Sequence, residues 1–167
     1  MVGLLVLAAA CSSTTAGPDI SAATATTAAP VATSAPATVG TRPWWIVGGT
    51  VTPGGPRLDG PDPVRSALDQ LLAGPSPDEA AFGAGTAIEK GVVVNSLVVG
   101  PDGVATVDFN RKFETKDTRP QVAQVVYTLT QFPQVSKVRF LIEGQPNGAT
   151  GVPPVGRADL RFPAAPG

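Results

Sequence analysis

The sequence contains no histidine and a single cysteine, Cys11. Histidine most often serves as the general base near neutral pH and is the commonest metal ligand, so its absence argues against both roles. A lone cysteine can form neither an internal disulfide nor a cysteine-based metal site. We therefore expect no metal, no cofactor and no histidine-dependent catalysis, and Cys11 requires a different explanation.

The sequence also lacks an excess of charge of either sign. Twelve lysine and arginine residues face 13 aspartate and glutamate residues, which gives a net charge of −1. Nucleic-acid-binding domains usually carry a clear basic excess, and anionic membrane surfaces attract polybasic clusters. We therefore expect no nucleic acid partner and no purely electrostatic attachment to a membrane.

Two kinds of catalytic site need no histidine, and neither fits the sequence. Ser136 and Lys137 are neighbours on a predicted strand and would point to opposite faces, so they cannot form a serine–lysine pair. A glycosidase needs two carboxylates across a cleft. Asp108 and Glu114 would lie in a small domain with little room for one, and Asp108 is expected instead to cap or pair at a strand end. The glycine pairs lack the helix and lysine of a phosphate-binding loop. We predict that the chain is not an enzyme.

The amino-terminal end explains the cysteine. Residues 2–10 are an uncharged apolar run, too short to span a bilayer and similar to the end of a secretory signal peptide. Ala8, Ala9 and Ala10 resemble a bacterial lipobox, which implies cleavage before Cys11, a diacylglycerol on its thiol and often acylation of the new amino group. The sequence departs from that pattern at Ala8, where leucine is preferred, and in lacking a preceding basic residue. This indicates a true start upstream.

Residues 1–11 are thus predicted to be a lipoprotein signal peptide and lipobox, with Cys11 as the site of lipid attachment. Residues 12–41 follow as a predicted disordered tether, because 24 of these 30 residues are Ala, Thr, Ser or Pro and only Asp19 is charged. Such a segment buries too little apolar surface to offset the entropy of ordering. As a flexible coil it would span about 30 Å.

A folded domain is predicted to begin where the composition changes, near Trp44. Residues 44–47 favour a strand, and the glycine pair at 48–49 can turn it back along residues 50–52. Trp44 and Trp45 would point to opposite faces of that strand, so at least one is expected in the core.

The clearest local signal is a helix over residues 63–73. Asp62 is a good N-cap, Pro63 suits the first helical position, and Gly74 followed by Pro75 ends the helix. Its apolar residues share one face: Val64, Ala67, Leu68, Leu71 and Leu72.

After a predicted loop over residues 76–90, residues 92–99 and 104–109 are expected to form a hairpin. The turn between them, at residues 100–103, contains the proline and glycine that such turns favour. In the second strand apolar residues alternate with polar ones, which indicates a sheet with one face covered.

Residues 118–131 can be interpreted as strand or helix. A run of 14 residues without a turn signal favours the helix. Residues 137–142 are predicted to form a last strand. The predicted order is β-α-β-β-α-β, an α+β fold whose four-stranded sheet carries both helices on one face.

Four stretches of the sequence, taken in order, carry a family resemblance: Asp62-Pro63 with Ala67-Leu68-Asp69-Gln70-Leu71-Leu72-Ala73-Gly74-Pro75; Thr86-Ala87-Ile88; Asp102-Gly103-Val104-Ala105-Thr106-Val107-Asp108-Phe109; and Gln124-Val125-Val126-Tyr127-Thr128-Leu129-Thr130-Gln131-Phe132-Pro133, followed by Val138-Arg139-Phe140 and Gly144. Together they resemble the GerMN domain, the sporulation and spore-germination domain, over about residues 42–145. The resemblance implies an extracytoplasmic envelope domain, often on a lipoprotein, without a known catalytic residue set. Because many members occur in bacteria that form no spores, the name alone does not assign that role.

We accordingly assign residues 42–146 to a GerMN-like domain and residues 147–167 to a C-terminal extension. Leu160 and Phe162 would be exposed if the extension were loose, so we expect the extension to contact the domain. It could do so by adding a short edge strand. Arg157 is expected to pair with Asp159 or another carboxylate.

The resulting hypothesis is a lipoprotein held on the extracytoplasmic face of the cell membrane by its lipid anchor. Its domain would be a non-catalytic module that binds an envelope protein or self-assembles, with sporulation or germination as one setting. The alternative is a binding module for a cell-wall polymer or small ligand, with Trp44 or Trp45 on an open sheet face. Exposed apolar residues on that face would favour the first hypothesis, and a groove lined by tryptophan and polar groups the second. The sequence names neither the partner nor the oligomeric state.

Overall fold

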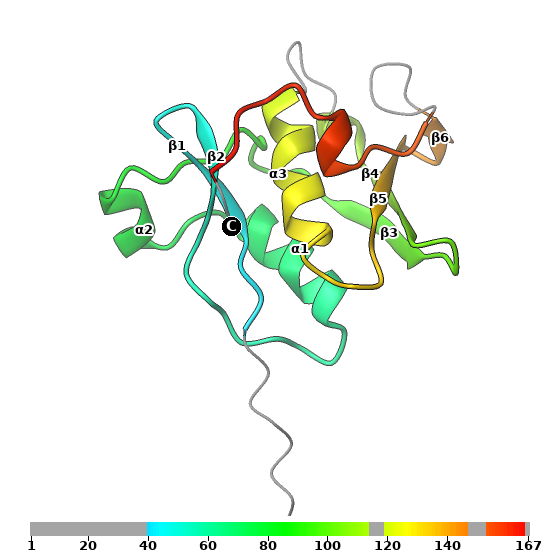
Figure 1. The fold of residues 1–167 in the computed structure, drawn as a ribbon, viewed down its shortest axis with the longest axis horizontal. Helices are drawn as coiled ribbons and strands as arrows, with labels where there is room; N and C mark the ends of the chain where they lie inside the picture. Colours follow the sequence, from blue (N-terminus) through cyan, green and yellow to red (C-terminus); the bar gives the residue numbers. More distant parts are fainter. Residues whose placement is uncertain (1–39, 114–118, 147–152, 166–167) are drawn as a thin grey trace, which may run out of the picture. The chain divides into compact units, whose positions relative to one another are not determined.

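The computed structural model describes residues 40–113, 119–146 and 153–165 (Figure 1). Cys11, the predicted signal peptide, most of the predicted tether and Glu114 lie outside the described residues. The described elements are β1 (Trp44–Val47), β2 (Thr50–Pro53), α1 (Pro63–Ala73), α2 (Pro77–Ala81), β3 (Val94–Val99), β4 (Val104–Phe109), α3 (Arg119–Leu129), β5 (Lys137–Ile142) and β6 (Gln145–Pro146), with 3-10 helices η1 (Arg111–Phe113) and η2 (Arg157–Asp159).

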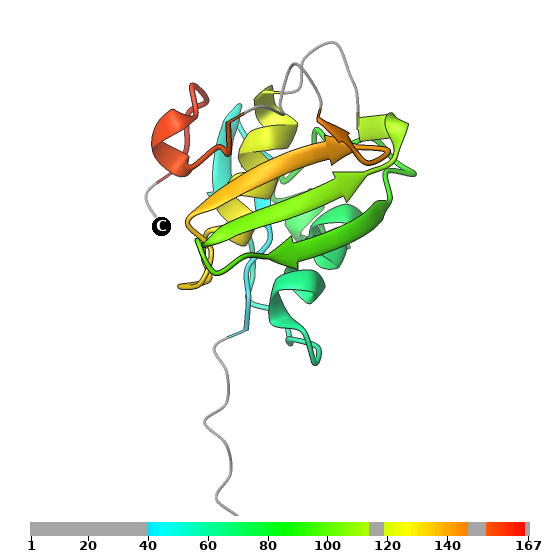
Figure 2. The same ribbon diagram turned by 90° about the vertical axis from the view of Figure 1, so that its right-hand side faces the viewer.

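A four-stranded sheet with the strand order β3-β4-β5-β6 forms one layer of the fold. β3 and β4 are the predicted antiparallel hairpin, and the chain then crosses through α3 so that β5 pairs parallel to β4. Both α1 and α3 cover one face of this sheet (Figure 2). The predicted α+β class, with four strands and two helices on one face, is confirmed.

The first strand is not part of that sheet, contrary to the predicted element order. β1 pairs only with β2, as a separate antiparallel hairpin, and the short strand β6 supplies the fourth strand instead. The hairpin packs on α3 on the side away from the large sheet (Figure 1). Its turn is made by Gly48 and Gly49, whose φ values of 58° and 81° favour glycine.

The main core lies between the large sheet and the two helices. Ala105, Val107 and Phe109 of β4 are fully buried, as the alternation predicted. Phe109 stacks on Phe113 of η1 with ring centroids 4.1 Å apart, and Phe140 of β5 lies 5.8 Å from Phe113. The sheet therefore turns its aromatic face toward the helices.

Both predicted long helices are present. α1 has the predicted bounds, and the Asp62 carboxylate accepts a hydrogen bond from the backbone N–H of Arg65 as the N-cap. α3 resolves the ambiguity over residues 118–131 in favour of the helix, with Pro120 in its first turn. The apolar face of α3 enters the core because the sheet and the hairpin lie on either side of it.

One helix inside the predicted loop over residues 76–90 was missed. α2 is short, and it begins with a capping box in which the Ser76 hydroxyl accepts from the N–H of Glu79 and the Glu79 carboxylate accepts from the N–H of Ser76. The Ser-x-x-Glu spacing was a readable signal for this helix start. No apolar stripe follows it, and none of the residues of α2 is buried.

The folded part of the chain begins earlier than expected. Gly40 and Thr41, assigned to the tether by composition, belong to the folded part: Thr41 is buried, and both its N–H and its hydroxyl donate to Asp59. This contact fixes the entry of the chain into the domain.

The described part of the C-terminal extension, residues 153–165, crosses the domain as a strap (Figure 1). It makes an isolated bridge between Val155 and Val138 and a parallel one between Ala164 and Val51, rather than a regular edge strand. Leu160 and Phe162 pack on the smaller core cluster of Trp44, Val51 and Ala123. The expected contact between the extension and the domain is confirmed.

Candidate functional site

A stripe of polar side chains on α3 and just beyond its end explains why β1 lies against this helix. Gln124, Thr128 and Gln131 recur at helical spacing and bond to the backbone of the incoming chain. Thr128 Oγ1 accepts from the N–H of Trp44 at 3.1 Å, and Gln124 Nε2 donates to the Trp44 carbonyl at 2.8 Å. Gln131 bonds to both backbone groups of Arg42.

The same stripe holds the loop that precedes β3. Gln124 Oε1 accepts from the N–H of Ala87 at 2.8 Å, and Gln121 Nε2 donates to the Ala87 carbonyl at 3.0 Å. Gln121 and Gln124 are both buried, with 2% and 0% of their surface exposed. Glutamine at helical spacing gives no apolar signal, so this stripe was not predicted from the sequence.

Both tryptophans are buried, which corrects their proposed role as ligand contacts on an open sheet face. Trp45 is 1% exposed and faces the main core, whereas Trp44 is 4% exposed and packs with Tyr127 of α3. Neither belongs to the large sheet, because β1 forms its own hairpin. Trp44 does reach the surface at its edge, where it borders a hollow.

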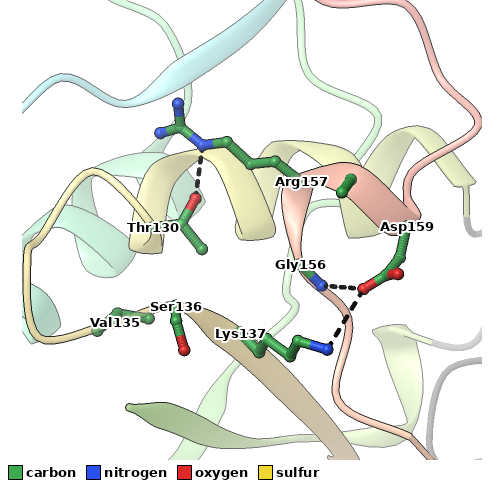
Figure 3. Close-up of a pocket in the computed structure, with 8 residues that line it drawn as sticks. Thr130, Val135, Ser136, Lys137, Gly156, Arg157 and Asp159 are labelled. Atoms are coloured by element: carbon green, nitrogen blue, oxygen red, sulfur yellow. Dashed lines mark hydrogen bonds and ion pairs between the residues drawn. The ribbon is translucent and has the colours of Figure 1, made fainter.

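Arg157 of η2 makes several polar contacts beside this hollow. Its Nε donates to Thr130 Oγ1 at 2.7 Å and its Nη2 donates to the Tyr127 carbonyl at 3.2 Å. Its guanidinium lies 4.8 Å from the ring centroid of Tyr127 and 5.4 Å from that of Trp44. The expected pairing with Asp159 is wrong, since Asp159 turns back to accept from the N–H of Gly156 (Figure 3).

Two shallow hollows meet at Arg157. One, of about 460 Å³, is lined by Arg42, Trp44, Pro53, Gln131 and Arg157, and we call it the arginine hollow. The other, of about 440 Å³, is shown in Figure 3 and lies between the end of α3, the start of β5 and η2.

Ser136 and Lys137 both line the second hollow, but they are not arranged as a catalytic pair. The Ser136 hydroxyl donates to the Gly103 carbonyl, while the Lys137 ammonium lies 3.9 Å from the Asp159 carboxylate. Asp108 caps the strand end as expected, accepting hydrogen bonds from the N–H of Gly144 and from the Asn95 amide. Among the described residues no group of three potential metal ligands comes together.

A second polar cluster is built around Glu79 of α2. Its carboxylate accepts hydrogen bonds from the Trp45 indole at 2.9 Å, the Gly55 N–H at 3.0 Å and the Ser76 N–H at 2.8 Å, and it pairs with Arg57. Burial alone would raise the pKa of Glu79, but the hydrogen bonds from Ser76, Trp45 and Gly55 outweigh it and lower the pKa from 4.5 to about 2. The cluster fastens α2 to the β1–β2 hairpin.

We expect the Glu79 cluster to make stability depend on pH. A folded-state pKa below the unfolded value stabilises the fold above about pH 5, and this contribution is lost as the pH falls toward 2. The shift corresponds to roughly 3 kcal/mol. Glu79→Gln should therefore lower the unfolding free energy at pH 7 by about that amount and flatten its decline between pH 5 and 3, measured by urea unfolding. The control is Asp78→Asn, at an exposed neighbouring carboxylate; parallel pH profiles for wild type and Glu79→Gln would contradict the assignment.

The outer face of the large sheet is left uncovered by the described helices (Figure 2). Val98 of β3 lies on it with 63% of its surface exposed, beside Thr106 of β4 and Arg139 of β5 in the same row. Leu141 is half-buried in the adjoining row. This face therefore carries apolar side chains bordered by a cation. Within the described residues, no helix is both long and apolar enough to cross a membrane.

Several solved structures are similar to this chain. The tandem GerMN domains of the sporulation protein GerM from Bacillus subtilis match with a TM-score of 0.55 and 23% identity, covering 71% of this chain but only 46% of that one. The first GerMN domain of the same protein matches with a TM-score of 0.52 and 25% identity, over 73% of this chain and 100% of that one. A structure from Clostridium perfringens, described as that of a candidate lipoprotein, matches with a TM-score of 0.52 and 17% identity, over 57% of this chain and 68% of that one.

A search of curated proteins found no match. The family model described as "Germane: Sporulation and spore germination" matches residues 46–148, which is more than half of the chain. The matched residues run from the β1–β2 hairpin past the last strand of the large sheet. The chain belongs to the Germane, or GerMN, family of sporulation and spore-germination domains.

Proposed function

We propose that this protein is a lipid-anchored, extracytoplasmic lipoprotein whose GerMN domain binds an envelope protein through the outer face of its large sheet, without catalysis. The observation that carries the proposal is the uncovered row of Val98, Thr106 and Arg139. Contiguous exposed apolar side chains rimmed by polar residues mark interaction sites. On this face Val98 and the half-buried Leu141 lie in adjoining rows, with Arg139 beside them. The flanking cation would orient a partner whose matching surface is acidic.

The anchor in this proposal is Cys11. A lone cysteine after an apolar run and three small residues suits acylation, and two or three acyl chains give stable membrane attachment. The family membership supports an envelope setting, and one structural neighbour is described as a candidate lipoprotein. The segment between Cys11 and Gly40 would hold the domain away from the membrane surface.

The proposal can be tested with the full chain, produced with any upstream residues. A photo-crosslinking amino acid replaces Val98, in the wild type and in Cys11→Ser, and cells are fractionated before intact-mass analysis. We expect the wild type in the membrane fraction with an acyl mass gain, and a discrete crosslink to one envelope protein. Cys11→Ser should be unacylated, should leave the membrane fraction and should lose most of that crosslink.

The matched control places the crosslinker at Asp69, which is exposed on α1 and lies away from the outer sheet face. An unmodified Cys11 in the wild type would refute the anchor. Equal adducts from positions 69 and 98, or none from either, would refute the interface. The two halves of the proposal are thus judged by separate readouts.

A further inference from the structure

The arginine hollow is lined by two arginines whose guanidinium groups no carboxylate of the described residues neutralises. Within those residues, the salt bridges join Arg57 to Glu79, Arg65 to Asp69 and Lys137 to Asp159. No such pair forms at Arg42 or Arg157, although both line the same hollow. The nearest acid in sequence, Asp159, is directed to the other side of η2 (Figure 3).

The fold holds the backbone of Arg42 and the guanidinium of Arg157 in place. The backbone of Arg42 is clamped by Gln131, which accepts from its N–H at 2.9 Å and donates to its carbonyl at 3.0 Å. The guanidinium of Arg157 is fixed by its bonds to Thr130 and Tyr127 and by its position over the Trp44 ring. These contacts occupy two of its N–H groups, so the others remain for a ligand. The preorganised guanidinium of Arg157 lowers the entropic cost of binding.

We propose that the arginine hollow binds a small ligand through an oxyanion, either a carboxylate or a phosphate. Guanidinium groups match both anions because their planar N–H donors form paired, charge-assisted hydrogen bonds. Trp44 and Pro53 give the hollow an apolar wall, and the Gln131 amide adds a polar one. Its volume of about 460 Å³ lies within the usual range for small-molecule sites, about 300 to 1,000 Å³. The hollow is separate from the outer sheet face, so a negative result for one proposal does not contradict the other.

The test uses the full chain carrying Cys11→Ser, titrated in low-salt buffer with inorganic phosphate and, separately, with citrate. Binding is followed by calorimetry and by the amide and indole NMR signals. We expect saturable one-site binding of at least one anion, with shifts at the Gln131 side-chain amide and the Trp44 indole. Arg42→Gln should weaken it about tenfold or more, the size expected for a lost charge-assisted hydrogen bond.

Arg42→Gln is the informative variant because Arg42 is tied to the fold only through its backbone in the contacts described, whereas Arg157 also supports the packing of Trp44. The matched control is Lys90→Gln, which removes an exposed cation that does not line the hollow and belongs to neither proposed site, and it should change affinity less than twofold. A preference for phosphate or for citrate would identify the anion, and either supports the site. Equal weakening in both variants, or non-saturable binding of both anions, would overturn it.

Discussion

Replacing Gln124 with alanine should lower the unfolding free energy by about 4 kcal/mol, the largest effect we expect from any single polar side chain in this domain. The side chain is fully buried and joins three elements: it donates to the carbonyl of Trp44 and accepts from Ala87 and Thr86. Its removal would leave a buried N–H and a buried carbonyl without partners, each costing about 1–3 kcal/mol. Urea unfolding followed by circular dichroism measures the change.

Two further variants show whether the hydrogen bonds are responsible. Gln134→Ala changes an exposed glutamine in the loop before β5 and should be within about 0.5 kcal/mol of wild type. In Gln124→Glu the buried acid would face the carbonyl of Trp44 and would be stable only when protonated. Its folded-state pKa would be raised, so stability should be retained at low pH and lost as the pH rises. A Gln124→Ala protein as stable as Gln134→Ala would show that the stripe on α3 does not hold β1.

Ending the chain after residue 152, and so removing the strap of residues 153–165, should cost about 4 kcal/mol. The strap contributes the packing of Leu160 and Phe162 on the smaller core cluster and two hydrogen bonds to the backbone of Val51. It also contributes the cation–π contacts of Arg157. Because Trp44 would lose its cover, its fluorescence should shift to longer wavelength.

The control ends the chain after Ala165, which keeps the whole strap. Trp45 serves as an internal control, since it faces the main core and bonds to Glu79 rather than to the strap. The truncated chain should also lose anion binding at the arginine hollow, because Arg157 forms part of its wall. An unchanged urea midpoint after truncation would mean that these contacts add no net stability.

The elements predicted well from the sequence are those whose bounds depend on residues close to one another in the chain. The bounds of α1 follow from the cap at Asp62, the apolar stripe and the stop at Gly74, all within a few turns of the helix. The β3–β4 hairpin follows from its turn and from alternation, although β3 begins two residues later than expected, with an irregularity in pairing between Val94 and Ser96. α2 could also have been found, because its capping box is local.

The candidate sites were mostly not predictable in this way. Arg157 was expected to pair with Asp159, two positions away, or with another carboxylate, because the sequence shows only near neighbours. In the folded protein its partners are Tyr127 and Thr130, which the strap reaches from the far end of the chain. The predicted ion pair with Asp159 does not form, because the Asp159 carboxylate instead accepts a hydrogen bond from the N–H of Gly156.

Composition, spacing and local motifs were enough to establish the lack of histidine chemistry, the lone Cys11, the α+β class and the family. Which strands share a sheet could be read only from the folded chain. β1 has the composition of a sheet strand, but side chains on α3, 80 and 84 residues further along the chain, bond to its backbone at Trp44. A contact at that separation leaves no periodic trace in either segment, so it appears only when the packed layers bring the two segments together.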